Sequence, residues 1–141
     1  MFILDTDAIT HDQNAHSLLS AKVKNTPKDW LFTTSVTVEE QLKGRLAYLK
    51  AFQTDPRKSA HGHAALVQTV FYFEKWNILI FSGEAYVIFH QLQKQRIRIG
   101  SQDLRIAAIA LFHDFTVITS NLRDFVRVPN LKIADWTSAI P

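Results

Sequence analysis

The sequence of 141 residues contains no cysteine, so neither a disulfide framework nor a thiolate metal site can form. It has only four glycines, which excludes a glycine-rich phosphate-binding loop. Its apolar runs are short and interrupted, so we expect no membrane-spanning helix, and the N-terminus lacks the pattern of a secretory signal. These absences predict a cytoplasmic protein that does not associate with membranes.

The composition is that of a folded domain with a mildly basic charge. Hydrophobic residues make up 47% of the chain and charged residues 21%, as in globular proteins. No repeat, linker or low-complexity segment divides the sequence, so we expect residues 1–141 to form one domain. The net charge of +3 favours a polyanionic partner such as a nucleic acid.

Apolar patterns of period 2 and period 3.6 alternate along the chain, which predicts strands that alternate with helices. Such an order indicates an α/β fold with a mainly parallel sheet of about five strands and helices on both faces, a three-layer α/β/α arrangement. The polar segment 55–63 is expected to be a loop, which would place His61 and His63 in solvent. The expected strands are 2–6, 31–37, 77–81, 116–120 and 131–136, and the expected helices are 38–52, 64–76, 83–96 and 103–114.

Acidic residues follow the ends of several expected strands. Asp5 stands at the end of the first strand and Asp7 follows it, Glu39 and Glu40 follow the second strand, and the turn 120–124 lies at the end of the strand 116–120. Ligands of open α/β sheets bind beyond the carboxyl ends of the strands. We therefore expect these acids to lie along one edge of the sheet, together with Asp103, which opens a later helix.

Helix capping is an alternative explanation for most of these acids. The sequence TVEE has the pattern of a capping box, with Thr37 as the N-cap and Glu40 at the third helical position. Capping does not explain Asp5, because a carboxylate at the end of a buried strand needs a partner or a cation. The other residues open to a role at a helix start are Asp7, Asp103 and Asn121 with Asp124.

Several carboxylates at one edge would repel one another, and some of their pKa values would rise. A bound divalent cation would remove this repulsion. Oxygen ligands without histidine or cysteine at ligand spacing favour Mg²⁺ or Mn²⁺ over zinc. The segment KQRIRIG, which carries Arg96 and Arg98, would place cations beside such a site, where they could contact a phosphate chain.

Four segments resemble the PIN-domain ribonucleases, and within them the VapC-type toxins of toxin–antitoxin pairs. The segments are LDTD, TVEEQLKG, RIRIGSQDLRIAAIAL and VITSNLRDFVRVPNLKIADW, and together they extend over nearly the whole chain. The resemblance assigns the catalytic acids to Asp5, to Glu40 four residues before Gly44, and to Asp103. The fourth position of the family is less regular, and Asn121 and Asp124 both remain candidates. Auxiliary roles would belong to Asp7, Thr37 and Ser120.

The resemblance implies a metal-dependent endoribonuclease of PIN-like fold, with Asp5, Glu40 and Asp103 as ligands of Mg²⁺ or Mn²⁺. RNA would be the substrate, and a small antitoxin would be the protein partner. The chain would assemble as a homodimer or as a toxin–antitoxin hetero-oligomer. Helices 38–52 and 64–76 each have more apolar residues than one core-facing stripe needs, and the additional residues would form these protein–protein contacts. The cations that would hold flanking RNA phosphates are Lys43, Arg45, Arg96 and Arg98.

Two other functions remain open from the sequence. The D-x-D pattern of Asp5 and Asp7 also resembles haloacid-dehalogenase-like phosphatases, in which Asp5 would be the nucleophile. Ile9 departs from that family, and the chain offers no persuasive later lysine or paired-aspartate turn. The second alternative is a module that binds nucleic acid without catalysis, since a fold does not determine a function.

Overall fold

The structure, a computed structural model, describes residues 1–139 and contains a five-stranded parallel sheet of order β3-β2-β1-β4-β5. Each neighbouring pair of strands is parallel. The predicted α/β fold with a mainly parallel sheet is therefore confirmed. The strands are β1 (Phe2–Leu4), β2 (Leu31–Thr34), β3 (Asn77–Leu79), β4 (Thr116–Ile118) and β5 (Ile133–Ala134).

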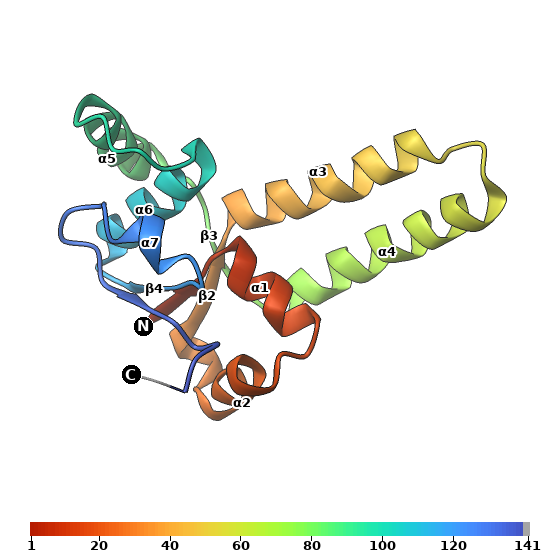
Figure 1. Cartoon of the computed structure of the whole chain (residues 1–141), viewed down its shortest axis with the longest axis horizontal. Helices are drawn as coiled ribbons and strands as arrows, with labels where there is room; N and C mark the ends of the chain where they lie inside the picture. Colours follow the sequence, from red (N-terminus) through yellow and green to blue (C-terminus); the bar gives the residue numbers. More distant parts are fainter. Residues whose placement is uncertain (140–141) are drawn as a thin grey trace.

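Helices connect the strands and cover both faces of the sheet (Figure 1). No helix within residues 1–139 is long and apolar enough to cross a membrane. The helices are α1 (Thr6–Gln13), α2 (Ser17–Asn25), a 3₁₀ turn (Lys28–Trp30), α3 (Ser35–Ala51), α4 (Pro56–Glu74), α5 (Gly83–Lys94), α6 (Ser101–His113) and α7 (Leu122–Phe125).

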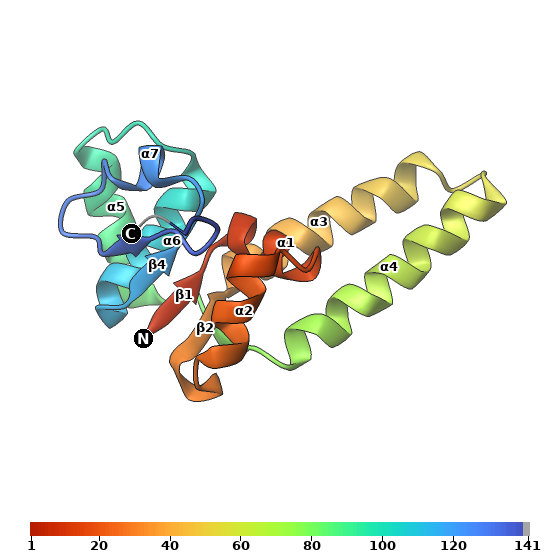
Figure 2. The same cartoon turned by 60° about the horizontal axis from the view of Figure 1, so that its bottom comes forward.

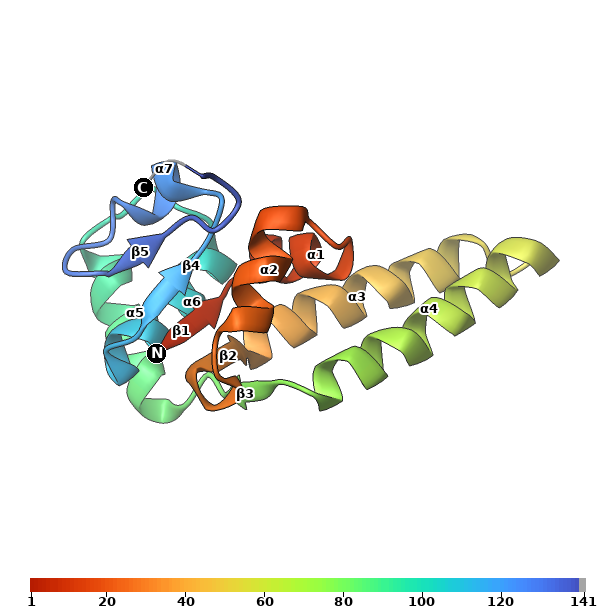
Figure 3. The same cartoon turned by 90° about the horizontal axis from the view of Figure 1, so that it is seen from below.

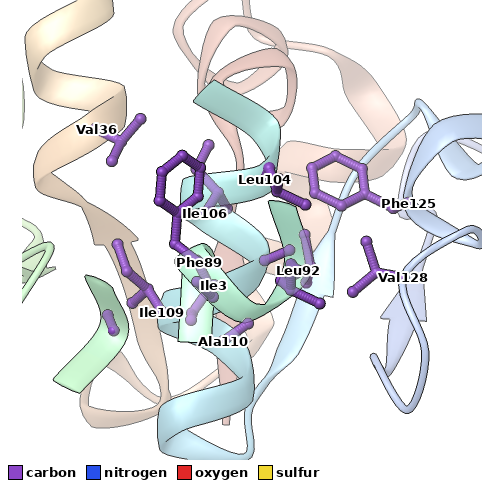
Figure 4. Close-up of a cluster of buried hydrophobic side chains, with 14 residues drawn as sticks. Ile3, Val36, Phe89, Leu92, Leu104, Ile106, Ile109, Ala110, Phe125 and Val128 are labelled. Atoms are coloured by element: carbon purple, nitrogen blue, oxygen red, sulfur yellow. The ribbon is translucent and has the colours of Figure 1, made fainter. Parts of the chain in front are cut away.

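The alternation of side chains along the strands divides the core into two layers. Ile3 of β1 and Val117 of β4 belong to the cluster formed with α5 and α6 (Figure 4). The next residues, Leu4 and Ile118, belong to the opposite cluster, which includes Leu19 of α2. All five side chains are fully buried, and each contributes roughly 1.5–3 kcal/mol to folding. Figure 2 shows α2 and α6 on opposite sides of β1, which gives the predicted three-layer arrangement.

Helices α3 and α4 form a hairpin that projects from the sheet (Figures 1 and 3). Gly62 of α4 packs so closely against α3 that a Cβ atom there would lie 2.8 Å from side-chain atoms of both Tyr48 and Leu49. On the outside of the hairpin, Val70 and Phe71 of α4 are 53% and 60% exposed. The prediction that some apolar residues of these helices face outward is confirmed.

Several sequence predictions about element boundaries are wrong, and helices α1 and α2 were not predicted. Strand β2 ends at Thr34, not at residue 37, and α3 begins at Ser35. The N-cap of α3 is Thr34, whose hydroxyl accepts the N–H of Thr37 at 3.2 Å, so Thr37 is not the N-cap of a capping box. Segment 56–63 is helical, because Asp55 caps α4 by accepting two N–H groups and Pro56 fits its first turn.

Candidate active site

Asp5 lies where β1 passes into α1, and it is only 2% exposed. Its Oδ1 accepts the N–H of Ala8 at 2.8 Å, so Asp5 is the N-cap of α1. The statement that capping does not explain Asp5 is therefore wrong. Its backbone N–H donates to the carbonyl of Ile118 in β4 at 3.1 Å, which fixes the residue at the carboxyl edge of the central strands. The carboxylate thus has a fixed orientation.

The environment of Asp5 disfavours its ionised form. The pKa of Asp5 is raised to about 7, mainly by burial and also by the negative charges of Asp7 and Asp103, although hydrogen bonds from Thr119 and Ala8 act in the opposite direction. The cap alone therefore does not compensate for burial of the charge. A carboxyl group perturbed by burial and by like charges is typical of functional sites.

Asp103 lies in the first turn of α6 and contributes a second perturbed carboxyl group. Its pKa is raised to about 6, first by burial and then by the charges of Glu40, Asp7 and Asp124. The structure therefore brings four other carboxylates within electrostatic reach of Asp103. We call the five groups the acidic cluster: Asp5, Asp7, Glu40, Asp103 and Asp124.

The two glutamates of TVEE have different surroundings. Glu40 faces the acidic cluster, and its Oε1 accepts the hydroxyl of Thr6 at 2.9 Å. Glu39 is exposed, and its Oε1 accepts the amide of Gln102 at 2.8 Å. Of the two glutamates, Glu40 is therefore the one that lies beside the other acids, and its role as a site residue stays a prediction.

The turn after β4 carries both candidates for the fourth position. Asn121 Nδ2 donates to Asp124 Oδ2 at 2.9 Å, so the two side chains form one unit and Asn121 does not cap α7 with its side chain. Asp124 alone of the two bears a charge that acts on Asp103. Ser120 is exposed, and its hydroxyl lies 3.4 Å from His11 Nε2.

The predicted phosphate contacts fall in different places. Lys43 is exposed on α3 and lines a cavity of about 500 Å³ with Glu39 and Arg105. Arg45 instead donates from Nε to the Thr69 hydroxyl of α4 at 3.0 Å, inside the hairpin. The exposed residues Arg96 and Arg98 lie between α5 and α6, before the helix that carries Asp103.

The donor atoms of the acidic cluster suit a hard divalent cation. All of them are carboxylate oxygens, and their mutual repulsion would be relieved by positive charge. Among residues 1–139, no three His, Asp or Glu side chains are close enough together to enclose a metal ion directly. The cluster therefore suits Mg²⁺ or Mn²⁺ in chemistry and charge. Direct contact with every carboxylate is not required, because Mg²⁺ commonly retains several of its waters.

Two threonines of the site were not identified from the sequence. The Thr119 hydroxyl bonds to the Asp5 carboxylate and also accepts the N–H of Asn121 at 2.9 Å. Thr6 bonds to Glu40, as described above. Their positions in the sequence could have identified them, since Thr6 lies between two acids and Thr119 comes directly after β4.

A parallel sheet of five strands between layers of helices, with acids beyond the carboxyl ends of its strands, is the arrangement that the sequence resemblance implies for a PIN domain. No protein-family model matches the chain. Ribonuclease VapC of Rickettsia bellii is 45% identical over 53 residues, which are 36% of this chain and 40% of that protein. Ribonuclease VapC1 of Haemophilus influenzae strain R2866 is 27% identical over 97% of this chain and 98% of its own length.

Solved structures agree with these relatives. VapBC-1 of nontypeable Haemophilus influenzae matches with a TM-score of 0.75 and 25% identity, over 97% of this chain and 98% of that chain. VapBC2 of Rickettsia felis, solved with a promoter DNA fragment, matches with a TM-score of 0.73 and 20% identity, over 96% and 98% of the two chains. The predicted resemblance to VapC-type PIN domains is confirmed by these similarities in sequence and fold.

Proposed function

We propose that the chain is a metal-dependent endoribonuclease that acts as the toxin of a type II toxin–antitoxin pair. The observation that carries the proposal is the acidic cluster, in which Asp5 and Asp103 both have raised pKa values beside Glu40. The ribonuclease names of the VapC relatives support the reaction class. Asp7, Glu40 and Asp103 are not fully buried, so the cluster is open to a polymeric substrate.

In this reaction Asp5, Glu40 and Asp103 would hold Mg²⁺ or Mn²⁺, with Asn121 and Asp124 as candidates for a further ligand. The bound ion would polarise the scissile phosphate and lower the pKa of a coordinated water. Asp5 contributes a fixed orientation, because its Oδ1 is held by the N–H of Ala8. Thr119 restrains the same carboxylate through its hydroxyl.

Cations around the cluster would hold the flanking phosphates of the RNA. Lys43, Arg96 and Arg98 are exposed and available for this role. Arg45 is a weaker candidate, because its Nε is engaged by Thr69 inside the α3–α4 hairpin. Phosphate contacts of this kind position a nucleic acid without reading its sequence.

A small antitoxin is the proposed protein partner, since the solved structures that match the chain include VapBC proteins of Rickettsia felis and Haemophilus influenzae. An arginine of the antitoxin could enter the acidic cluster, because a guanidinium group matches paired carboxylates. The exposed side chains of Val70 and Phe71 on α4 offer an apolar contact for such a partner or for a second copy of the chain.

The phosphatase alternative requires Asp5 to attack phosphorus. Its Oδ1 is already held by the Ala8 N–H and its carboxylate by Thr119, and its raised pKa leaves a smaller ionised fraction at neutral pH. These contacts favour a ligand role for Asp5 over a nucleophilic one. A covalent aspartyl-phosphate would be the distinguishing mark of the phosphatase.

The test is incubation of the purified chain with total RNA, in Mg²⁺, in Mn²⁺ and in EDTA, followed by mapping of the fragment ends. We expect internal cleavage that requires the metal and is lost in Asp5→Asn, Glu40→Gln and Asp103→Asn. The exposed Asp29→Asn serves as the matched control and should cleave like the wild type. Binding of RNA without cleavage would favour the non-catalytic alternative and contradict the proposal.

The antitoxin proposal needs a separate experiment. The chain is expressed in cells with and without the product of its neighbouring reading frame, and growth and co-purification are measured. We expect growth arrest by the chain alone and rescue by the partner. Equal growth in both cases, with no small protein co-purifying, would rule out the toxin–antitoxin role while leaving the nuclease activity open.

A further inference from the structure

Thr6 connects the acidic cluster to a chain of buried hydroxyl groups. Its hydroxyl donates to Glu40 Oε1 at 2.9 Å and lies 3.1 Å from Thr37 Oγ1. A hydroxyl has a single hydrogen, which Thr6 gives to Glu40, so the hydrogen between Thr6 and Thr37 must come from Thr37. The contact between the two threonines therefore has a fixed direction.

A second hydroxyl donor, Thr34, extends this chain of hydrogen bonds further into the protein. Thr34 Oγ1 donates to Thr37 Oγ1 at 3.4 Å and accepts the backbone N–H of Thr37 at 3.2 Å. Thr34 and Thr37 are both 0% exposed, so water does not compete for these groups. The hydroxyls of Thr34, Thr37 and Thr6 thus form a donor chain that ends on the Glu40 carboxylate, and such chains strengthen their last bond by polarisation.

Glu40 needs an external restraint at this place. Its charge repels that of Asp103, and a glutamate side chain with three rotatable bonds would relieve this repulsion by turning into solvent. The bond from Thr6 opposes that movement at one carboxylate oxygen. The other oxygen, Oε2, has no hydrogen bond within residues 1–139 and is free to meet a cation.

We propose that Thr6 is a positioning residue, which holds Glu40 toward the acidic cluster at the end of the Thr34–Thr37–Thr6 hydroxyl chain. The inference rests on the proposed function, since Glu40 is assigned there as a metal ligand. Thr6 acts through Glu40 and does not itself touch the substrate. Its removal should therefore weaken metal binding more than it changes the rate at saturating metal.

The test measures Mn²⁺ binding by electron paramagnetic resonance and RNA cleavage as a function of Mn²⁺ concentration. Thr6→Val should bind Mn²⁺ about 10–100-fold more weakly, as is usual when a residue that orients a ligand is lost. Thr6→Ser, which keeps the hydroxyl, should restore most of the affinity. The matched control is Thr10→Val on the same helix, where the hydroxyl donates to the backbone carbonyl of Thr6 and accepts the side-chain amide of Gln41 at 3.3 Å but does not bond to Glu40.

The same substitution in a protein that lacks Glu40 shows whether Thr6 acts by positioning Glu40 or has a general structural effect. In a Glu40→Ala protein, adding Thr6→Val should cause no further loss of Mn²⁺ affinity, because the group on which Thr6 acts is absent. Thr37→Val should weaken binding less than Thr6→Val, and it serves as the test variant if Thr6→Val does not fold. Urea unfolding of every variant verifies that the folded state is being compared.

The outcomes distinguish this inference from the function on which it rests. A wild-type chain that neither binds Mn²⁺ nor cleaves RNA overturns both. With an active wild type, equal Mn²⁺ affinity of Thr6→Val and wild type overturns the positioning role alone. An equal loss from Thr6→Val with and without Glu40, or failure of Thr6→Ser to restore binding, also overturns it.

Discussion

Replacement of Asp5 by asparagine should stabilise the metal-free protein at neutral and alkaline pH. The folded-state pKa of Asp5 is about 7, against about 3.8 in the unfolded chain. Below pH 3.8 the group is protonated in both states, so it contributes no pH dependence. As the pH rises toward 7, the unfolded chain ionises first, and the wild type loses stability until the folded state also ionises.

The size of the effect follows from the two pKa values. The unfolding free energy of Asp5→Asn should exceed that of the wild type by about 1 kcal/mol at pH 4.5, by about 3 kcal/mol at pH 6 and by about 4 kcal/mol at pH 8. Asparagine is as good an N-cap as aspartate, so the hydrogen bond to the Ala8 N–H is kept and does not offset the gain.

Urea unfolding in EDTA at pH 4.5, 6 and 8, followed by tryptophan fluorescence, measures the difference directly. Asp29→Asn, at an exposed position, is the control and should track the wild type at every pH. An Asp5→Asn protein that is less stable than wild type at pH 8, or a difference that does not change with pH, would refute the reasoning and make Asp5 a structural residue. Loss of cleavage with retained stability is the expected combination.

Further predictions follow from the cluster and from the hairpin. Asp103→Asn should abolish cleavage and leave the unfolding free energy in EDTA at pH 8 unchanged or raised, because it removes a charge that repels its neighbours; a clear loss of stability would contradict this. Gly62→Ala should lower the unfolding free energy by about 1–2 kcal/mol, because its Cβ would lie 2.8 Å from side-chain atoms of Tyr48 and Leu49. Gly44→Ala on the same hairpin has open space and should raise stability by about 0.5–1 kcal/mol in the same urea assay.

The sheet and the acids could be predicted from sequence because both follow from short-range rules. Ile3 and Leu4 are apolar and face opposite layers of the core, so an uninterrupted apolar run predicts a doubly covered strand. Acids placed directly after such strands share an edge when the strands are parallel. The electrostatic contact between Asp5 and Asp103, which lie far apart in the sequence, agrees with this expectation.

The missed boundaries each have a local physical cause. The β-branched residues after Thr34 favour a strand, but the Thr34 hydroxyl captures the N–H of Thr37 and starts a helix instead. Pro56 indicates a break in the chain, yet at the first turn of α4 it costs no hydrogen bond. Helix α1 buries few apolar residues, Ala8 and Ile9, so it has too little periodicity to be detected.

Asp5 shows why the cap and the functional site could not be separated by sequence reasoning. A helix N-terminus stabilises a negative charge by its N–H groups and its dipole, and the Ala8 N–H supplies this at Asp5. Burial and the neighbouring charges nevertheless outweigh that stabilisation, since the pKa of Asp5 is still raised. The cap therefore orients the carboxylate without neutralising it. A cation that binds only the folded chain would supply the missing positive charge. Asp5 lowers the stability of the metal-free protein, and through the same carboxylate it would make the stability of the fold depend on metal binding.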